Sequence, residues 1–212
     1  MRSSMPRTTV AGSLAFLAVL LAGCGAAKPI HYYGLESPSV APSAGTALPV
    51  TLMIGHFTAP NIYRDNRLIY RKSANQMDIY EQQRWAEPPA EMVREMLLRV
   101  LRASNRYRSV HMTGSNVRGD YILRGRVHHF EEVDAPALGA RVEIEAELYD
   151  PATGSTLWTH HYQQEEAANG TTVPAVVEAI NRAVQKGVSE IVASLDQYLT
   201  EHPPAAAGAK SE

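Results

Sequence analysis

The chain has 212 residues, of which 45% are hydrophobic, and it carries 20 Lys and Arg against 22 Asp and Glu. This near balance of charge excludes the basic surface of a nucleic-acid-binding protein, so we expect no nucleic-acid partner. The single cysteine excludes a disulfide within the chain, so the stability of the fold must come from the packing of a core.

The first 23 residues have the layout of an export signal. Arg2 and Arg7 precede a mostly apolar run over residues 10–21, and small residues follow. The apolar run is too short to cross a bilayer comfortably. Residues 21–24, Leu-Ala-Gly-Cys, resemble a bacterial lipobox, in which the cysteine takes a diacylglycerol, the preceding peptide is removed and the new amino end is acylated with palmitate.

Cys24 is therefore the expected lipidation site, and residues 1–23 are the expected signal peptide. Two or three acyl chains anchor a protein stably, because each buried methylene contributes about 0.8 kcal/mol. The alternatives are a plain secretory peptide that happens to contain a cysteine, and an uncleaved helix that stays in the membrane. Gly25 stands where an Asp would resemble the inner-membrane retention signal, so we expect an anchor on the periplasmic face of the outer membrane.

The composition of residues 24–48 predicts a lipidated tether, because a segment rich in Ala, Pro, Ser and Gly cannot bury enough apolar surface to fold. Residues 31–35 are too apolar for an idle linker, and we expect a short strand there that pairs with the domain edge. One domain is predicted over residues 49–200, and a disordered tail over residues 201–212.

Alternating and continuous apolar patterns predict most of this domain to be strands. The predicted strands cover residues 50–57, 67–71, 77–81, 107–111, 120–130, 141–149 and 156–162. The clearest pattern lies in residues 141–149, where Val142, Ile144, Ala146 and Leu148 are expected to point inward. The alternate residues of this strand, which include Glu145, are charged, so the sheet should have one solvated face.

Two helices are predicted from apolar residues at helical spacing. The first runs over residues 89–104, and the second begins after Thr172, whose hydroxyl can cap it, with Pro174 in its first turn. Gly187 interrupts the apolar stripe of the second helix and indicates close packing against a neighbour. The order of elements predicts an α+β fold, in which two helices pack on one face of an antiparallel sheet.

Two histidine pairs raise the question of a metal-dependent enzyme. Residues 128–129 and 160–161 are both His-His, on strands that could be neighbours, and Glu131 or Glu143 could complete a zinc site. Successive residues of a strand point to opposite faces, so at most one histidine of each pair should serve a common site. Solvated histidines at a sheet edge are the favoured interpretation. The sequence also contains neither a Gly-x-Ser-x-Gly elbow nor a phosphate-binding glycine loop, so we expect no enzyme activity, no metal and no cofactor.

Several stretches together resemble one family, the PqiC-like auxiliary lipoproteins of ABC-type transport systems, which accompany mammalian-cell-entry (MCE) proteins in lipid transport. They are the lipobox ending at Cys24, Tyr32, Tyr33 and Leu35, Arg64 with residues 67–71, residues 84–88, and residues 121–127. The resemblance implies a noncatalytic subunit that couples a periplasmic MCE-type protein and ABC transporter components to the outer membrane. The alternative is an envelope assembly or scaffold lipoprotein with no transport role, and either could form a homo-oligomer.

The partner-binding residues that the resemblance suggests are Tyr70, Tyr80, Arg84 and Trp85. They cluster in sequence around the predicted hairpin and the start of the first helix. Packing in the core is the favoured interpretation of the aromatic residues. The other interpretation is a docking surface, since Trp, Tyr and Arg commonly supply interface anchors.

Overall fold

The structure of the protein is a computed structural model, which describes residues 28–39, 46–134 and 137–203. Cys24, the signal peptide and most of the predicted tail lie outside the described residues. From His31 onward the chain forms one compact unit. No helix among the described residues is long and apolar enough to cross a membrane.

The described residues of this unit form eight strands, two long helices and one short helix. Their bounds are β1 His31–Tyr33, β2 Leu48–Thr58, η1 Asn61–Tyr63, β3 Arg67–Ser73, β4 Gln76–Trp85, α2 Pro89–Ala103, β5 Tyr107–Met112, β6 Tyr121–Val133, β7 Gly139–Asp150, β8 Ser155–Ala167 and α3 Val173–Glu201.

The eight strands make one mixed sheet in the order β1-β4-β3-β6-β2-β5, and β7 and β8 extend from β6. The predicted hairpins β3–β4 and β7–β8 are antiparallel, whereas β1–β4, β2–β5, β2–β6 and β3–β6 are parallel. The α+β class is confirmed, but the sheet is not purely antiparallel. Each parallel pair joins strands that are not consecutive in the chain, whereas the consecutive pairs β3–β4, β6–β7 and β7–β8 are antiparallel.

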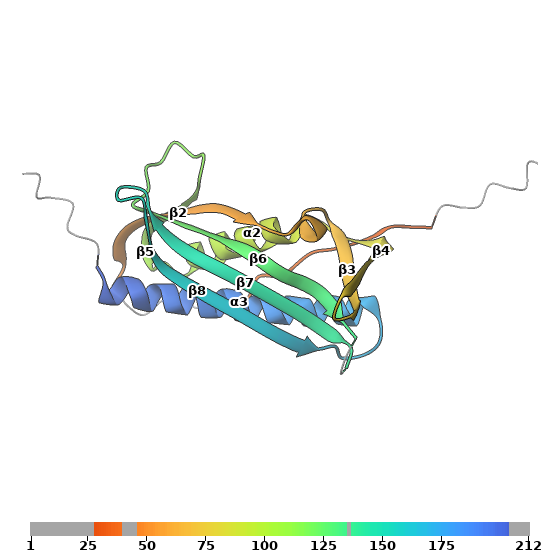
Figure 1. Ribbon diagram of the computed structural model, residues 1–212. Helices are drawn as coiled ribbons and strands as arrows, with labels where there is room; N and C mark the ends of the chain where they lie inside the picture. The colour runs from red at the N-terminus through yellow and green to blue at the C-terminus, as the bar shows by residue number, and fades with distance from the viewer. Residues whose placement is uncertain (1–27, 40–45, 135–136, 204–212) are drawn as a thin grey trace, which may run out of the picture. The chain divides into compact units, whose positions relative to one another are not determined.

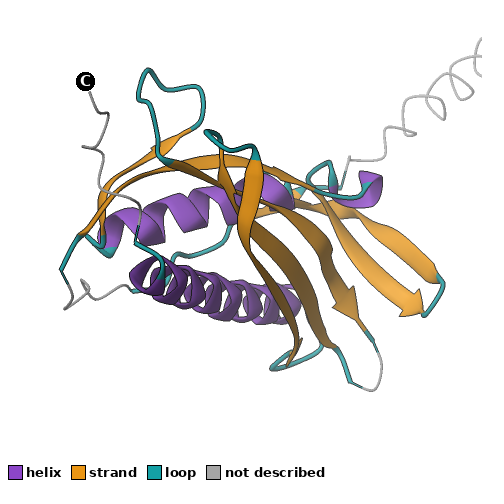
Figure 2. Ribbon diagram, turned by 60° about the vertical axis from the view of Figure 1, so that its left-hand side comes forward, coloured by secondary structure: helices purple, strands orange, loops and turns teal. Residues whose placement is uncertain are grey.

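Both helices cover the same face of the sheet, as predicted (Figures 1 and 2). α2 packs on β2 and β5, α3 packs on β7 and β8, and the helices also contact each other. The inward residues of β7 are fully buried on this side. We call this the helix face of the sheet, and the opposite side the outer face.

Local signals in α3 behave as the sequence predicts. The Thr172 hydroxyl accepts a hydrogen bond from the amide of Ala175, which satisfies one of the free N–H groups of the first turn. Gly187 lies against the ring of Tyr162 on β8, and a Cβ at this position would come within 2.6 Å of that ring. The glycine therefore allows the close helix–sheet contact that it indicates.

The folded unit begins inside the segment predicted to be the tether. β1 pairs in parallel with residues 83–85 of β4, which confirms the short strand at the domain edge. The chain then crosses α3, where the amide of Glu36 donates to Asn181 Oδ1 (3.0 Å) and Gln185 Nε2 donates to the Glu36 carbonyl (2.8 Å). Tyr33 and Leu35 pack against the core. Residues 31–36 thus belong to the domain, because apolar contacts and backbone pairing hold them there.

Candidate functional site

Two adjacent carboxylates on β6, Glu131 and Glu132, are buried where the β3–β4 hairpin meets the rest of the sheet. They are 0% and 6% exposed, respectively. Because successive residues of a strand point to opposite faces, Glu131 lies on the outer face and Glu132 on the helix face. The hairpin and η1 supply the groups that hold both of them.

On the outer face, the carboxylate of Glu131 is the centre of a polar network. Arg71 Nε donates to one oxygen (2.7 Å), and the Tyr63 hydroxyl donates to the other (2.7 Å). His129 Nδ1 lies 3.3 Å away, and Arg141 Nη1 lies 3.9 Å away. Burial, followed by the bond to Glu131, raises the pKa of Tyr63 well above its usual range, so its hydroxyl remains a donor. This network fixes η1 and β3 to β6.

On the helix face, Glu132 contacts the aromatic pair of the hairpin. The Tyr80 hydroxyl lies 3.0 and 2.9 Å from the two carboxylate oxygens of Glu132. The rings of Tyr70 and Tyr80 are 4.7 Å apart, and Lys72 Nζ lies 5.3 Å from the centre of the Tyr70 ring. Burial raises the pKa of Glu132, and the hydrogen bond from Tyr80 opposes this shift only in part. Tyr70 and Tyr80 are both half-buried.

The structure separates the other two predicted partner-binding residues from this pair. Trp85 is 1% exposed and packs edge-on against Phe130, with ring centroids 5.2 Å apart. It is therefore a core residue and has no surface with which to anchor a partner, because its strand turns it under the helices. Arg84 points to the outer face, and its guanidinium donates to the carbonyl of Tyr80 (2.6 Å).

The arrangement of the histidines differs from the prediction in one respect. The register of β6 on β7 shifts at His128, which makes this residue a bulge and brings it to the same face as His129. His128 lies 3.8 Å from Glu145, and His129 lies 3.6 Å from Glu143. His161 Nε2 contacts the same Glu143 at 2.8 Å. The prediction that adjacent histidines face opposite ways is wrong for this pair, because the bulge inserts one residue into the alternation.

The other pair follows the alternation rule. His160 turns to the helix face, where its Nε2 lies 2.9 Å from Glu190 on α3, while its neighbour His161 faces outward. In the part of the chain that the structure describes, no group of three or more His, Cys, Asp or Glu side chains is placed to hold a metal ion.

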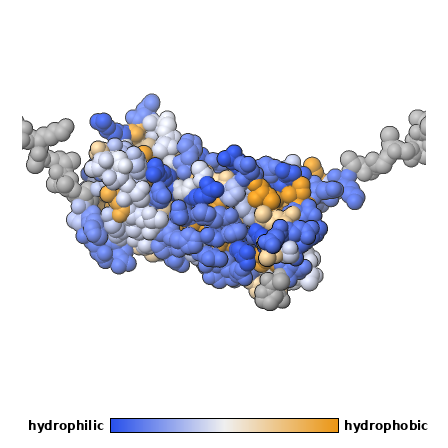
Figure 3. Space-filling model, viewed as in Figure 1, coloured by the Kyte–Doolittle hydropathy of each residue, from blue (hydrophilic) through white to orange (hydrophobic). Residues whose placement is uncertain are grey.

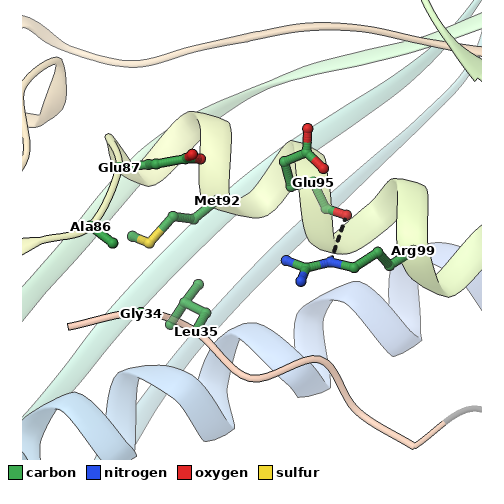
Figure 4. A pocket seen from close by; sticks show the side chains of 7 residues that line it. All are labelled: Gly34, Leu35, Ala86, Glu87, Met92, Glu95 and Arg99. Carbon is green, nitrogen blue, oxygen red and sulfur yellow. Dashed lines mark hydrogen bonds between the residues drawn. The ribbon is translucent and has the colours of Figure 1, made fainter.

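The surface around these elements is uneven in character. The area over β6, β7 and β8 is mostly hydrophilic, and hydrophobic side chains gather toward the end of the sheet that carries β3 and β4 (Figure 3). A shallow groove of about 320 Å³ lies between the segment after β1 and the start of α2. Its lining is mixed, because Leu35 and Met92 are apolar whereas Glu87, Glu95 and Arg99 are charged (Figure 4). Such a groove is small and polar for a lipid acyl chain.

The residues that hold the hairpin were only partly predictable. Arg71 lies in a stretch that carries the family resemblance, but its pairing with Glu131 joins positions 60 residues apart. Glu131 and Glu132 follow directly on a predicted strand, and one of two consecutive strand residues must point to the helix face. This pattern could have indicated a buried carboxylate that needs a partner. The contacts of Glu131 and Glu132 fix the aromatic hairpin to β6 on both faces of the sheet.

The family comparison covers most of the domain. The family model described as "ABC-type transport auxiliary lipoprotein component" matches residues 33–192, from the end of β1 into α3. A comparison with curated protein sequences finds no match.

Solved structures share the fold at low sequence identity. The crystal structure of protein XCC0632 from Xanthomonas campestris is similar with a TM-score of 0.74 and 20% identity, over 82% of this chain and 100% of that one. The crystal structure of an uncharacterized protein is similar with a TM-score of 0.63 and 16% identity, over 79% of this chain and 99% of that one. The structure of the hypothetical protein CT253 from Chlamydia trachomatis is similar with a TM-score of 0.52 and 9% identity, over 72% of this chain and 99% of that one.

Proposed function

Because the chain belongs to the family of ABC-type transport auxiliary lipoprotein components, we propose that it is a noncatalytic, lipid-anchored subunit of an MCE-type lipid transport system. In this role it couples the periplasmic MCE-type protein to the outer membrane. The observation that carries the proposal is the span of the family match, which takes in all of β2 to β8 and most of α3 rather than one motif.

The β3–β4 hairpin is the proposed docking surface for the MCE-type protein. Beyond β3, β4 pairs only with β1 and only at residues 83–85, so the rest of its other edge has no neighbouring strand among the described residues. An open strand edge can accept a strand from a partner, and aromatic side chains beside it can supply anchors. Tyr70 and Tyr80 lie on this hairpin, which the contacts of Glu131 and Glu132 hold rigid.

The docking surface is tested by truncating one tyrosine of the pair. Tyr70→Ala should weaken capture of the MCE-domain protein encoded in the same operon by tenfold or more, because hot-spot truncations cost about 2 kcal/mol. Tyr149→Ala is the matched control, since Tyr149 is also half-buried on a strand but lies at the opposite end of the sheet, against Arg124. Circular dichroism must show both variants folded. Equal capture by both variants would move the interface to the outer face around Arg141 and Glu143.

The anchor is tested separately with Cys24→Ser. The variant should be a soluble periplasmic protein without acyl chains, because the chain has no second cysteine to modify. Cell fractionation followed by carbonate extraction measures the change. A variant that still sediments with membranes and resists extraction shows that another segment holds the protein. If a deletion strain keeps a normal lipid balance and no MCE protein is captured, the scaffold role replaces the transport role.

A further inference from the structure

The proposed anchor lies very close to the folded unit. β1 fixes His31 to the sheet, and only six residues separate His31 from Cys24. A fully extended chain covers at most about 3.5 Å per residue, so seven steps reach about 25 Å. Lipidation at Cys24 would therefore hold His31, and with it the β1 end of β4, close to the membrane surface, with His31 at most about 25 Å away. A tether that ran to residue 48 would not do so.

Three side chains on neighbouring strands form a row on the outer face at this edge. Tyr32 of β1 is the Cα partner of Arg84 on β4, which is in turn the partner of Arg67 on β3. Directly paired residues of adjacent strands share a face, so all three side chains lie on the same side. Tyr32 is 63% exposed, more than any other large hydrophobic side chain of the folded unit that the structure describes.

The charges of the Tyr32–Arg84–Arg67 row are incompletely balanced. Like charges placed directly opposite each other on adjacent strands are unfavourable. Asp65 pairs with Arg67 at 2.7 Å, and the pKa of Asp65 is lowered first by that hydrogen bond and more weakly by Arg84. One carboxylate therefore serves two guanidinium groups, and the exposed Arg64 beside it adds a third cation. The row is suited to an additional anion.

We propose that the Tyr32–Arg84–Arg67 row lies on the membrane surface, where the two arginines bind the phosphates of anionic phospholipid headgroups and Tyr32 enters the interfacial layer. Guanidinium groups match phosphate oxygens in geometry and charge, and tyrosine is enriched at membrane interfaces because its ring is apolar and its hydroxyl is polar. The inference rests on the proposed anchoring through Cys24. It orients the domain with its β1–β4 edge toward the bilayer.

A single introduced cysteine reports on this contact, because acylated Cys24 leaves no other thiol to label. The lipidated full-length protein carrying His31→Cys is labelled with a fluorophore and reconstituted into vesicles of phosphatidylethanolamine and phosphatidylglycerol with a nitroxide on the headgroup. Val117→Cys is the reference position, since Val117 is exposed in the β5–β6 loop at the opposite end of the sheet (Figure 1). Quenching at position 31 should exceed quenching at position 117 at least threefold.

A pair of charge reversals on β3 tests the role of the arginines. Arg67→Glu should lower the quenching at position 31 at least twofold, whereas Lys72→Glu should leave it unchanged. The two are matched, because each breaks an ion pair of similar exposure, Arg67–Asp65 or Lys72–Asp78, on the same strand. Equal quenching at positions 31 and 117, or equal effects of the two reversals, overturns the inference.

The remaining outcomes separate this inference from the proposed function. A protein whose intact mass shows no acyl chains, and which does not float with the vesicles, refutes the anchor itself. A protein that floats but shows no quenching at position 31 refutes only the contact. If that position is shielded from iodide only when the MCE-domain protein is added, the row belongs to the protein interface and the membrane contact is wrong.

Discussion

Glu131 and Glu132 are neighbours in the chain and are buried to nearly the same degree, yet the two faces of the sheet hold them in different ways. Glu131 accepts hydrogen bonds from a guanidinium and a phenol, with the imidazole of His129 at 3.3 Å and the guanidinium of Arg141 at 3.9 Å. Glu132 has one phenol, and burial raises its pKa. The outer face thus gives its buried carboxylate an arginine partner as well as a phenol, whereas the helix face gives a phenol alone and burial raises the pKa there. Burial raises the pKa of a carboxylate, and a cation placed beside it acts in the opposite direction.

The largest effect on stability is expected from a third buried carboxylate, placed on the helix face with no cation beside it. Leu148 is fully buried on the helix face, opposite Leu123 and Trp158. Leu148→Asp should cost several kcal/mol, a large part of the total stability of a domain, and should unfold the protein. Glu145→Lys, on the solvated side of the same strand, should change stability by less than about 0.5 kcal/mol. Thermal melts by circular dichroism compare them, and similar melting temperatures would contradict the assignment of faces.

A smaller effect is expected when the cation of the outer face is removed. Arg71 has a side chain that is only 13% exposed, and Arg71→Met removes the guanidinium that pairs with Glu131 at 2.7 Å. Removing one partner of a buried ion pair costs about 3–5 kcal/mol. Urea denaturation should show this loss, and the double variant Arg71→Met with Glu131→Gln should recover much of it. A single variant as stable as the wild type would show that Tyr63 and the other neighbours suffice.

On the helix face, Tyr80→Phe should cost only about 1–2 kcal/mol, the usual range for a hydrogen bond lost from a buried acceptor. The loss should be larger at pH 8 than at pH 5, because the missing bond favours the ionised form of Glu132. Urea denaturation of wild type and variant at both pH values measures the difference. An equal loss at both pH values would mean that Glu132 does not change its charge over this range.

The smallest effect concerns pH in the unmodified protein. The pKa of Glu132 is higher in the folded than in the unfolded chain. The contribution of this shift to the free energy of unfolding is therefore fully present below the unfolded pKa, and it is lost as pH rises through the folded pKa. Asp196 has a raised pKa for the same main reason, burial, and acts in the same direction. Subtracting the stability of Glu132→Gln from that of the wild type at each pH isolates the first group. A difference that does not fall with rising pH would refute the shift.

Features that depend on a few consecutive residues could be predicted from the sequence, whereas features that depend on distant partners could not. The inward residues of β7, the cap at Thr172 and the close packing at Gly187 all follow from local spacing. The parallel pairs and the branching at β6 do not, because alternation shows which face a residue takes and says nothing of its neighbouring strand. The bulge at His128 could not be predicted for a related reason, because one inserted residue changes the face to which a side chain points without changing the composition of the strand.

The same limit applied to the candidate site. Sequence placed Tyr70, Tyr80, Arg84 and Trp85 together, and the structure divides them among the helix face, the outer face and the core. Burial of Trp85 follows from the closeness of Phe130, 45 positions along the chain, which no local pattern contains.

The contacts of the segment that follows β1 also set an order of events during folding. Glu36 is joined to Asn181 and Gln185, partners 145 and 149 positions away on the last helix of the domain. In an exported chain that emerges from its N-terminus, these partners arrive last, and contacts of such long sequence separation form late. Residues 34–36 therefore cannot make their final contacts with α3 until nearly the whole domain has emerged. Docking of residues 34–36 on α3 therefore completes the fold, and the lipidation proposed for Cys24 would have that interval in which to occur.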